Sequence, residues 1–253
     1  MQQDAKHSEL PKDLLPDHVL GHAGAVLLGL PGGGCSPAIF ANTQHDALLV
    51  YGVDWASWPG PWNVENLATR LAHALRKRAG PTLLAGHSLG GMITLLTALK
   101  AGKKVNGLLL SNTGAHTGGH GDASLPDRVR TAWTEEISDA FLLSCFLRPP
   151  PPALWQEMRD YMARINRDAF LEAVITLRRI DVRPLLGEIA CPAVIAHGRH
   201  DRRRHISFAQ ELADGIPDTA LILIDGGHTP MIDNPQEYRA ALDALVQLTK
   251  TGG

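Results

Sequence analysis

The residues that could do chemistry begin with a serine inside a glycine-flanked pentapeptide. Residues 86–90 read Gly-His-Ser-Leu-Gly, which is the pattern G-x-S-x-G. Segment 81–85 before it has the composition of a buried strand, and segment 89–100 after it is rich in helix formers. A serine on a sharp strand-to-helix turn presents its hydroxyl outward, and small residues on either side relieve the strain of that turn. Ser88 is therefore a candidate nucleophile, with an ordinary strand–helix turn as the alternative.

A serine hydroxyl is a weak nucleophile at neutral pH, so it needs a base and a group that orients the base. Asp201 and His228 each follow an apolar segment and a glycine, within segments 193–201 and 221–228. Side chains that follow the carboxyl ends of parallel strands meet at one edge of an open sheet. The chain order Ser88, Asp201, His228 is the order expected for a serine–acid–histidine triad on such a sheet.

The rest of the chain must supply the sheet that positions these side chains. Apolar segments alternate with helix-like segments, which predicts an α/β fold with a mainly parallel, doubly wound sheet. Leu67, Leu71 and Leu75 recur at a spacing of four residues and predict one apolar helix face. Strands are expected at 25–30, 47–53, 82–85, 107–111, 193–197 and 220–224, and helices at 64–79, 89–100, 207–214 and 235–248.

Segment 114–184 interrupts this alternation. It contains helix-like stretches at 127–143, 154–165 and 168–178, and four consecutive prolines at 149–152 separate the first two. A helix cannot continue through such a run of prolines. The segment is therefore expected to be a helical insertion between the strands at 107–111 and 193–197.

Four motifs of the chain resemble those of the α/β-hydrolases and follow the same order. Within that family the resemblance is to the branch of small esterases, lactonases and proline iminopeptidase-like enzymes. The motifs are L-P-G-G-G-C-S-P at 30–37, G-H-S-L-G-G at 86–91, H-G-R-H-D at 197–201 and G-G-H-T-P-M-I-D-N-P at 226–235. The resemblance covers the chain from about Val26 to its end. Two departures stand out: Pro31 replaces a histidine that is frequent in the family, and segment 53–62 lacks the family's D-x-x-G-x-G-x-S loop.

The resemblance implies roles for further residues. The backbone N–H groups of Gly33 and Leu89 would form an oxyanion hole, and glycine at position 33 leaves its amide uncovered. Asp201 is favoured over Asp225 and Asp233 as the acid, because it alone has the strand–turn placement of the family. Segment 114–184 would be a cap that excludes water and selects substrate, with residues 1–113 and 185–253 as the core domain.

Two clusters near these motifs admit both a functional and a structural interpretation. Trp55, Trp58 and Trp62 lie in one proline-rich loop, where they could line a substrate pocket or hold the loop in place. The three arginines at 202–204 could bind a carboxylate or phosphate of the substrate, or form a solvated turn. His87 is expected to orient or pack rather than act as the base, because adjacent side chains on the turn point apart.

The composition narrows the possible classes of function. The 253 residues carry a formal net charge of −2, so no general affinity for nucleic acid or anionic membranes is expected. Three widely spaced cysteines suggest no disulfide framework, and Cys35 and Cys191 are expected to pack. The sequence has neither H-E-x-x-H nor paired cysteines, so no metal and no cofactor is expected. A polar segment 1–17 and the lack of any long apolar run predict a cytoplasmic protein with no membrane partner.

Together these features predict a serine hydrolase that cleaves a small-molecule carboxylic ester, lactone or thioester through an acyl-enzyme on Ser88. His228 would serve as general base and acid, and Asp201 would orient it. Two other classes stay open: a hydrolase-like receptor that binds a ligand, and a non-hydrolytic lyase that uses the same serine and histidine. Neither the physiological substrate nor the oligomeric state follows from the sequence.

Overall fold

Six parallel strands form the sheet at the centre of the described structure. The computed structural model describes residues 14–118, 124–131 and 133–251. Within these residues the sheet has the order β2-β1-β3-β4-β5-β6, and all neighbouring strands are parallel. The predicted α/β class is confirmed, and the ends of each strand differ from prediction by at most two residues. The strands are β1 (Val26–Leu30), β2 (Leu49–Gly52), β3 (Thr82–His87), β4 (Gly107–Ser111), β5 (Ala193–Gly198) and β6 (Thr219–Ile224).

The burial of the strands explains why their sequences are continuous apolar runs. Every residue of β1, β3, β4 and β5 is buried, as expected for strands covered by helices on both faces. The edge strands β2 and β6 are only half-buried over most of their length. The register pairs Leu30 with Gly86 and His87 with Ser111, so the loops after β1, β3 and β4 start side by side.

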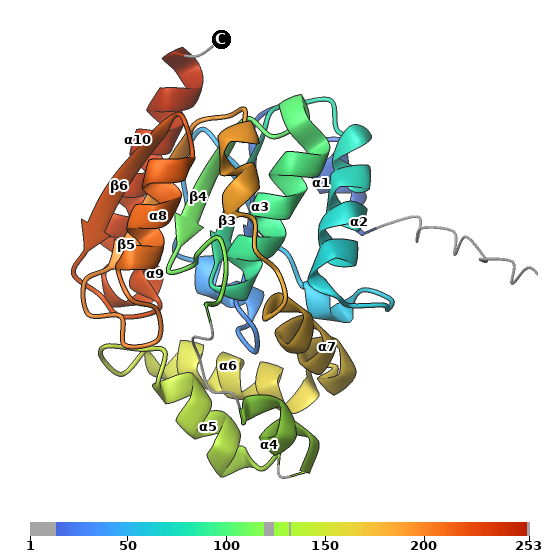
Figure 1. Cartoon of the computed structure of the whole chain (residues 1–253), viewed down its shortest axis with the longest axis vertical. Helices are drawn as coiled ribbons and strands as arrows, with labels where there is room; N and C mark the ends of the chain where they lie inside the picture. The colour runs from blue at the N-terminus through green and yellow to red at the C-terminus, as the bar shows by residue number, and fades with distance from the viewer. Residues whose placement is uncertain (1–13, 119–123, 132, 252–253) are drawn as a thin grey trace, which may run out of the picture.

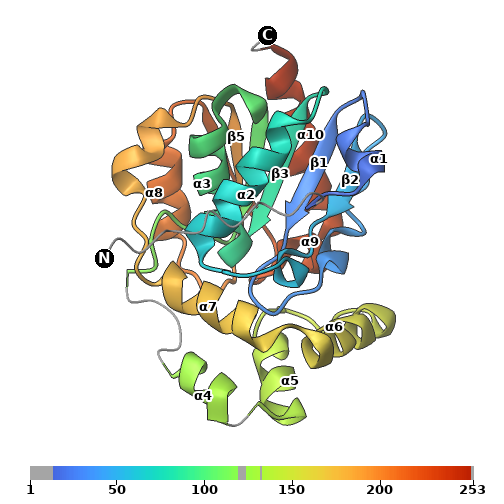
Figure 2. The ribbon, with the colours of Figure 1, turned by 90° about the vertical axis from the view of Figure 1, so that its right-hand side faces the viewer.

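Helices cover both faces of the sheet. Figures 1 and 2 show α2 (Val64–Arg76), α3 (Leu89–Ala101) and α8 (Ser207–Gly215) on one face and α10 (Pro235–Thr251) on the other. Leu67, Leu71 and Leu75 are fully buried, which confirms the apolar face predicted for α2. Within the described part of the chain, no helix is both long and apolar enough to cross a membrane. The short elements are α1 (Asp17–Leu20), α9 (Pro230–Asp233) and the 3-10 helices η1 (Pro37–Phe40), η2 (Trp55–Ser57), η3 (Gly102–Lys104) and η4 (Arg183–Glu188).

Four helices lie beyond the carboxyl ends of the strands, at the end of the sheet toward which the strand arrows point (Figures 1 and 2). They are α4 (Leu125–Thr131), α5 (Glu135–Leu143), α6 (Pro152–Arg164) and α7 (Arg167–Leu177), and we call them the cap helices. The prediction of one helix over 127–143 is wrong, because α4 and α5 are separate helices. The second begins where the hydroxyl of Thr134 accepts a hydrogen bond from the N–H of Ile137. Residues 1–13, 119–123, 132 and 252–253 of the predicted domains lie outside the described residues.

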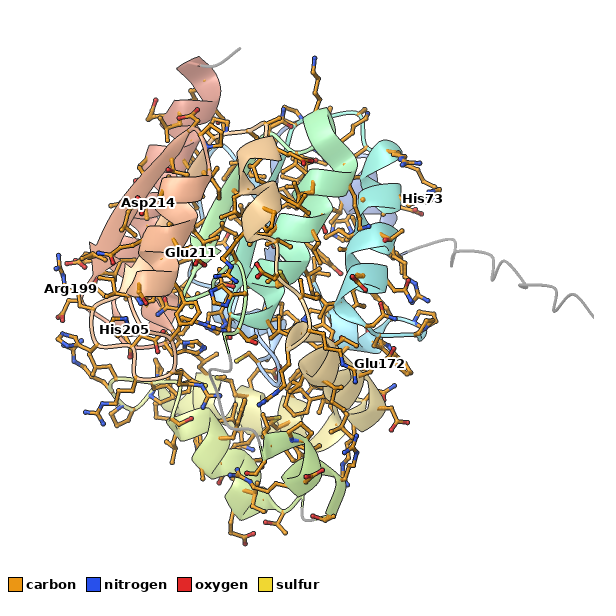
Figure 3. The ribbon with its side chains drawn as sticks, in the orientation of Figure 1. His73, Glu172, Arg199, His205, Glu211 and Asp214 are labelled. Atoms are coloured by element: carbon orange, nitrogen blue, oxygen red, sulfur yellow. The ribbon has the colours of Figure 1, made fainter. Side chains whose placement is uncertain are left out.

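Two carboxylates join the cap helices to the rest of the molecule. Glu172 projects from α7 near the start of α2 (Figure 3), and it accepts hydrogen bonds from the backbone N–H groups of Trp62 at 2.8 Å and Asn63 at 3.0 Å. Asp233 accepts hydrogen bonds from the N–H groups of Leu147, in the segment between α5 and α6, and of Gly227, beside His228. The positions of the cap helices are therefore linked to the loops at the carboxyl edge.

Candidate active site

Three side chains from three loops at this edge form a continuous chain of hydrogen bonds. Ser88 lies between β3 and α3, Asp201 follows β5, and His228 follows β6. The Nε2 atom of His228 lies 3.0 Å from Oγ of Ser88, and its Nδ1 atom lies 2.8 Å from Oδ2 of Asp201. The structure thus brings together the three residues predicted from the motifs, with the imidazole between the hydroxyl and the carboxylate.

The turn at Ser88 is strained, and close packing holds it. Ser88 has φ 52° and ψ −117°, a region that residues other than glycine rarely adopt. A Cβ atom at Gly86 would lie 2.5 Å from the hydroxyl of Thr94, and one at Gly90 would overlap the carbonyl oxygen of Leu30. The two flanking glycines of the motif therefore let α3 approach both β3 and the loop after β1.

Asp201 is a fully buried carboxylate whose oxygens are all engaged. It accepts hydrogen bonds from Asn112 Nδ2 at 2.6 Å and from the backbone N–H groups of Arg203 at 2.7 Å and Arg204 at 3.0 Å, besides that from His228. Burial acts to raise the pKa of Asp201, but the charge of His228 and these hydrogen bonds outweigh it and hold the pKa well below its usual range. Asp201 is therefore ionised and can stabilise a positive charge on His228.

Asn112 is a site residue that the sequence reasoning missed. It follows β4 directly, has φ 48°, and donates from Nδ2 to both Asp201 and the carbonyl of Gly227, while its Oδ1 accepts from the N–H of Gly198. One side chain therefore ties together the loops after β4, β5 and β6. The available signal was its position at the carboxyl end of a predicted strand, which is where the other site residues also lie.

His87 bridges two loops of the site, in agreement with the predicted orienting or packing role. It is fully buried; its Nδ1 accepts from the N–H of Gly32 at 3.2 Å, and its Nε2 lies 2.9 Å from the carbonyl oxygen of His228. These contacts require a neutral ring with the proton on Nε2. Burial, and next the charge of His228, lower the pKa of His87 to about 3.

The two competing aspartates lie elsewhere. The Asp225 side chain is about half exposed and contacts His200 and Arg148. Asp233 accepts the hydrogen bonds from Leu147 and Gly227 described above, and burial raises its pKa. Asp201 alone among the three contacts His228 through its side chain. This geometry favours Asp201 in the acidic role.

The loop after β1 lies beside Ser88. Gly33 and Leu89 both line the cavity above the serine hydroxyl, and Leu89 opens α3, where a backbone N–H has no acceptor within its own helix. Close packing explains glycine at 33, since a Cβ there would lie 2.9 Å from the ring of Phe170. The two residues predicted to supply the oxyanion hole thus line the same cavity as the candidate nucleophile.

A cavity with about 100 Å³ of free volume opens at Ser88, between the sheet edge and the cap helices. Its wall is largely apolar, and its charged members are arginines. Of the three arginines at 202–204, Arg202 is exposed, so the solvated-turn interpretation holds for Arg202 but not for the other two. The lining residues are Gly33, Ser88, Leu89, Thr117, Leu125, Phe141, Phe170, Val174, Leu177, Arg178, Arg203, Arg204 and His228.

The three tryptophans are not among the residues that line this cavity. Trp55 is buried and its Nε1 donates to the carbonyl of Pro31 at 3.0 Å, while Trp62 donates to the carbonyl of Trp58 at 2.5 Å. An indole N–H needs a partner when it is buried, and here the partners are backbone carbonyls of the neighbouring loops. The contacts match the alternative interpretation, in which the tryptophans hold the loop in place.

The other titratable clusters offer no ligand set for a metal. Among residues 14–118, 124–131 and 133–251, no group of three or more histidine, cysteine, aspartate or glutamate side chains could hold one. The cysteines at 35, 145 and 191 are buried free thiols. His116 instead pairs with Glu211 of α8, which Figure 3 labels, at 3.2 Å.

Known proteins are similar to this chain in sequence and in fold. A protein of Agrobacterium fabrum named "Putative carbamate hydrolase RutD" is 26% identical over 62% of this chain and 64% of its own length. A pimeloyl-[acyl-carrier protein] methyl ester esterase of Chromobacterium violaceum is 26% identical over 85% of this chain and 81% of its own. An esterase from Exiguobacterium antarcticum shares the fold, with a TM-score of 0.80 at 19% identity over 89% of this chain and 92% of its own.

The family model of the "Alpha/beta hydrolase family" matches residues 26–241, which include all six strands, the cap helices and the three hydrogen-bonded side chains. A match over that much of the chain, together with the parallel sheet and the order of the motifs, means that this chain belongs to the alpha/beta hydrolase family.

Proposed function

We propose that the protein is a serine hydrolase that cleaves a small carboxylic ester, lactone or thioester through an acyl-enzyme on Ser88. The observation that carries the proposal is the unbroken line of hydrogen bonds from Ser88 through His228 to Asp201. Each distance lies in the range required for proton transfer or for orienting a base. The membership of the hydrolase family supports the same reaction class.

In the proposed first step, Oγ of Ser88 attacks the ester carbonyl while Nε2 of His228 takes the hydroxyl proton. The carbonyl oxygen becomes an oxyanion, which the N–H groups of Gly33 and Leu89 bind. The carbon–oxygen bond to the alcohol then breaks, and His228 returns its proton to the leaving alcohol. Asp201 stays ionised and stabilises the protonated imidazole.

In the second step, water replaces the alcohol. His228 takes a proton from the water as its oxygen attacks the acyl carbon, and the same two N–H groups bind the second oxyanion. The bond to Oγ of Ser88 breaks, Ser88 regains a proton from His228, and the acid leaves. The cap helices would exclude bulk water from the intermediate.

The test uses turnover and covalent labelling together. We expect hydrolysis of p-nitrophenyl esters, measured from acetate to octanoate, with a preference for the shorter acyl groups because the cavity is small. Ser88→Ala should abolish turnover without loss of the folded state. An alkyl fluorophosphonate should add its phosphonyl group to Ser88, as read by mass spectrometry of the tryptic peptide.

Other outcomes separate the alternatives. Hydrolysis retained in Ser88→Ala would overturn the proposal. Labelling of Ser88 without turnover of any ester would direct the search to carbamates, which the name of one relative mentions, or to a lyase reaction. Neither labelling nor turnover, with ligand binding unchanged in Ser88→Ala, would indicate a receptor.

A further inference from the structure

Arg204 is a buried arginine in the wall of the cavity beside Ser88. Only 8% of its surface is exposed, and it lines the cavity together with Arg178 and Arg203. Its backbone N–H donates to Asp201, which fixes its position three residues after that carboxylate. The side chain therefore starts from a rigid part of the site and reaches the cavity that the substrate would occupy.

The guanidinium of Arg204 is only partly satisfied by the protein. One nitrogen, Nη1, donates to the carbonyl of His116 at 3.4 Å, and Cζ lies over the ring of Phe208, 4.7 Å from the ring centre. Its Nε has no acceptor among the described residues, and none of their carboxylates lies within ion-pair distance of the group. Burial lowers the pKa of Arg204, while the charge of Asp201 partly opposes that shift.

Arg78 shows what a buried arginine with a structural role looks like in this protein. It is 2% exposed, and all three of its nitrogens donate. Nε donates to the hydroxyl of Thr82, and Nη1 and Nη2 donate to four backbone carbonyls, among them those of Val19 and Pro81. A buried cation normally requires such partners, because desolvation of an unpaired charge is unfavourable. Arg204 has only the carbonyl of His116 as such a partner, and it lies at the candidate active site.

The surroundings of Arg204 define the ligand group that would supply the missing partner. The described part of the cavity wall contains two further arginines but no aspartate or glutamate. Guanidinium groups stacked on aromatic rings keep their edges free, and such an edge matches the two oxygens of a carboxylate. Arg203 also lies against an aromatic ring, with its Cζ 4.7 Å from the centre of the Phe141 ring, and its Nη1 donates to the hydroxyl of Ser144 at 2.5 Å.

We propose that the substrate cleaved at Ser88 carries a carboxylate besides its scissile carbonyl, and that Arg204 binds this carboxylate and sets specificity. The inference rests on the proposed hydrolase function, and it narrows the substrate class to half-esters and other monoanionic esters. Arg204 and Ser88 line the same cavity, so one bound molecule would present its carboxylate and its scissile carbonyl to the two residues. Arg178 and Arg203 add positive charge to the same wall.

The test compares matched anionic and neutral ligands in a protein that cannot turn them over. In the Ser88→Ala background, calorimetry would measure binding of mono(p-nitrophenyl) glutarate against p-nitrophenyl pentanoate, with the carboxylate on the acyl side. A second pair, p-(butyryloxy)benzoate against phenyl butyrate, places it on the alcohol side. We expect the anionic member of at least one pair to bind about ten- to a hundred-fold more tightly, as is typical of hydrogen bonds to charged groups.

Variants of Arg204 then locate the source of this preference. Arg204→Met should abolish it, and Arg204→Lys, which keeps the charge without the planar fork, should retain a part of it. Arg199→Met is the matched control, because Arg199 is exposed at the edge of the molecule (Figure 3) and should keep the full preference. Thermal unfolding of each variant shows whether it is folded.

Equal binding of the anionic and neutral members of both pairs by the Ser88→Ala protein would overturn the inference, whatever the variants do. A preference that survives in folded Arg204→Met would also overturn it. Turnover by the protein with Ser88 intact is read separately. If the preference depends on Arg204 but Ser88 is neither labelled nor able to hydrolyse any ester, the proposed hydrolysis fails, while Arg204 still stands as a binding residue for carboxylates.

Discussion

The residues around His228 differ in protonation state and in the groups that they contact. Asp201 is ionised, buried and in contact with the imidazole, whereas His87 is neutral, buried and hydrogen-bonded to backbone groups, with its ring against that of His228. Ser88 has the strained conformation that a strand-to-helix turn imposes on it. The chemical role of each group thus follows from its protonation state and from the direction in which its loop holds it.

Replacement of Asp201 by asparagine should remove most of the activity. An amide at this position can donate to Nδ1 of His228. The imidazole proton would then lie on Nε2, so Nε2 could not accept the proton of Ser88. We expect kcat for a p-nitrophenyl ester to fall by roughly 10³–10⁴, as in other triads. Asp225→Asn is the matched control, since the Asp225 side chain is about half exposed and pairs with Arg148 and His200 rather than with His228. A larger loss there would contradict the assignment of the acid.

His87 should make the stability of the protein depend on pH. Its pKa of about 3 in the folded state lies below the value of about 6.5 in an unfolded chain. Below about pH 6.5 the unfolded state binds a proton at His87 that the folded state does not bind. The contribution of His87 to the free energy of unfolding is therefore complete above that pH and is lost as the pH falls toward the folded pKa. The loss between pH 7 and pH 5 is about 2 kcal/mol.

Urea unfolding at pH 7 and pH 5 measures this effect. His87→Gln should lose about 2 kcal/mol of the pH dependence relative to the unmodified protein. The control is His73→Gln, because His73 is exposed on α2 (Figure 3) and should leave the pH dependence unchanged. The same pH dependence in all three proteins would show that His87 is not held neutral in the folded state.

At the scale of elements, the start of α3 is fixed by how closely it approaches the loop after β1. Residues 89–98 of α3 are all buried, since the helix lies among the sheet, α2 and α7. Gly90 faces the carbonyl of Leu30, and Gly91 faces the side chain of Thr113. The contact at Gly90 holds the start of α3 against the first residues of the loop that carries Gly33.

Alanine at position 90 should therefore destabilise the protein although it improves helix propensity. Within a helix, alanine is favoured over glycine by about 1 kcal/mol, but here its Cβ would overlap a backbone carbonyl that cannot move independently of β1. We expect a loss of about 1–3 kcal/mol in urea unfolding. Gly187→Ala, at an open position in η4, should instead be neutral or stabilise by up to about 1 kcal/mol.

At the scale of the whole molecule, the cavity depends on how the cap helices are held over the sheet edge. Phe141, Phe170 and Val174 come from the cap helices, while Ser88 and His228 come from the sheet edge. Glu172 joins the two parts, and the hydroxyl of Thr176 adds a bond to the N–H of Val64 at 3.2 Å. The start of α2 is thus capped by side chains of α7.

Removal of the Glu172 carboxylate should loosen this attachment. Glu172→Ala leaves the N–H groups of Trp62 and Asn63 without their acceptor, for a loss of about 1–3 kcal/mol in the free energy of unfolding. Glu172→Gln keeps one acceptor oxygen and should lose less. Limited proteolysis should cut the alanine variant first within the cap helices, and unchanged protection there would show that other contacts hold them.

The sequence alone determined the order and type of the elements and the three residues of the hydrogen-bonded chain. Continuous apolar runs identify buried parallel strands, and a motif such as G-x-S-x-G is tied to one backbone conformation, so Ser88, Asp201 and His228 could be read locally. The start of a new helix at Glu135 was missed, because the helical pattern of the sequence continues across Trp133 and Thr134, which are not helical.

Only the tertiary structure decided which neighbours support and line the site. Asn112 contacts Asp201 across 89 residues of sequence, and His87 contacts the carbonyl of His228 across 141. Residue type and spacing do not encode such contacts, since they depend on the sheet order and on side-chain packing. For the same reason the tryptophans took on a bracing role, and Arg204, one of three consecutive arginines, became buried while Arg202 stayed in solvent.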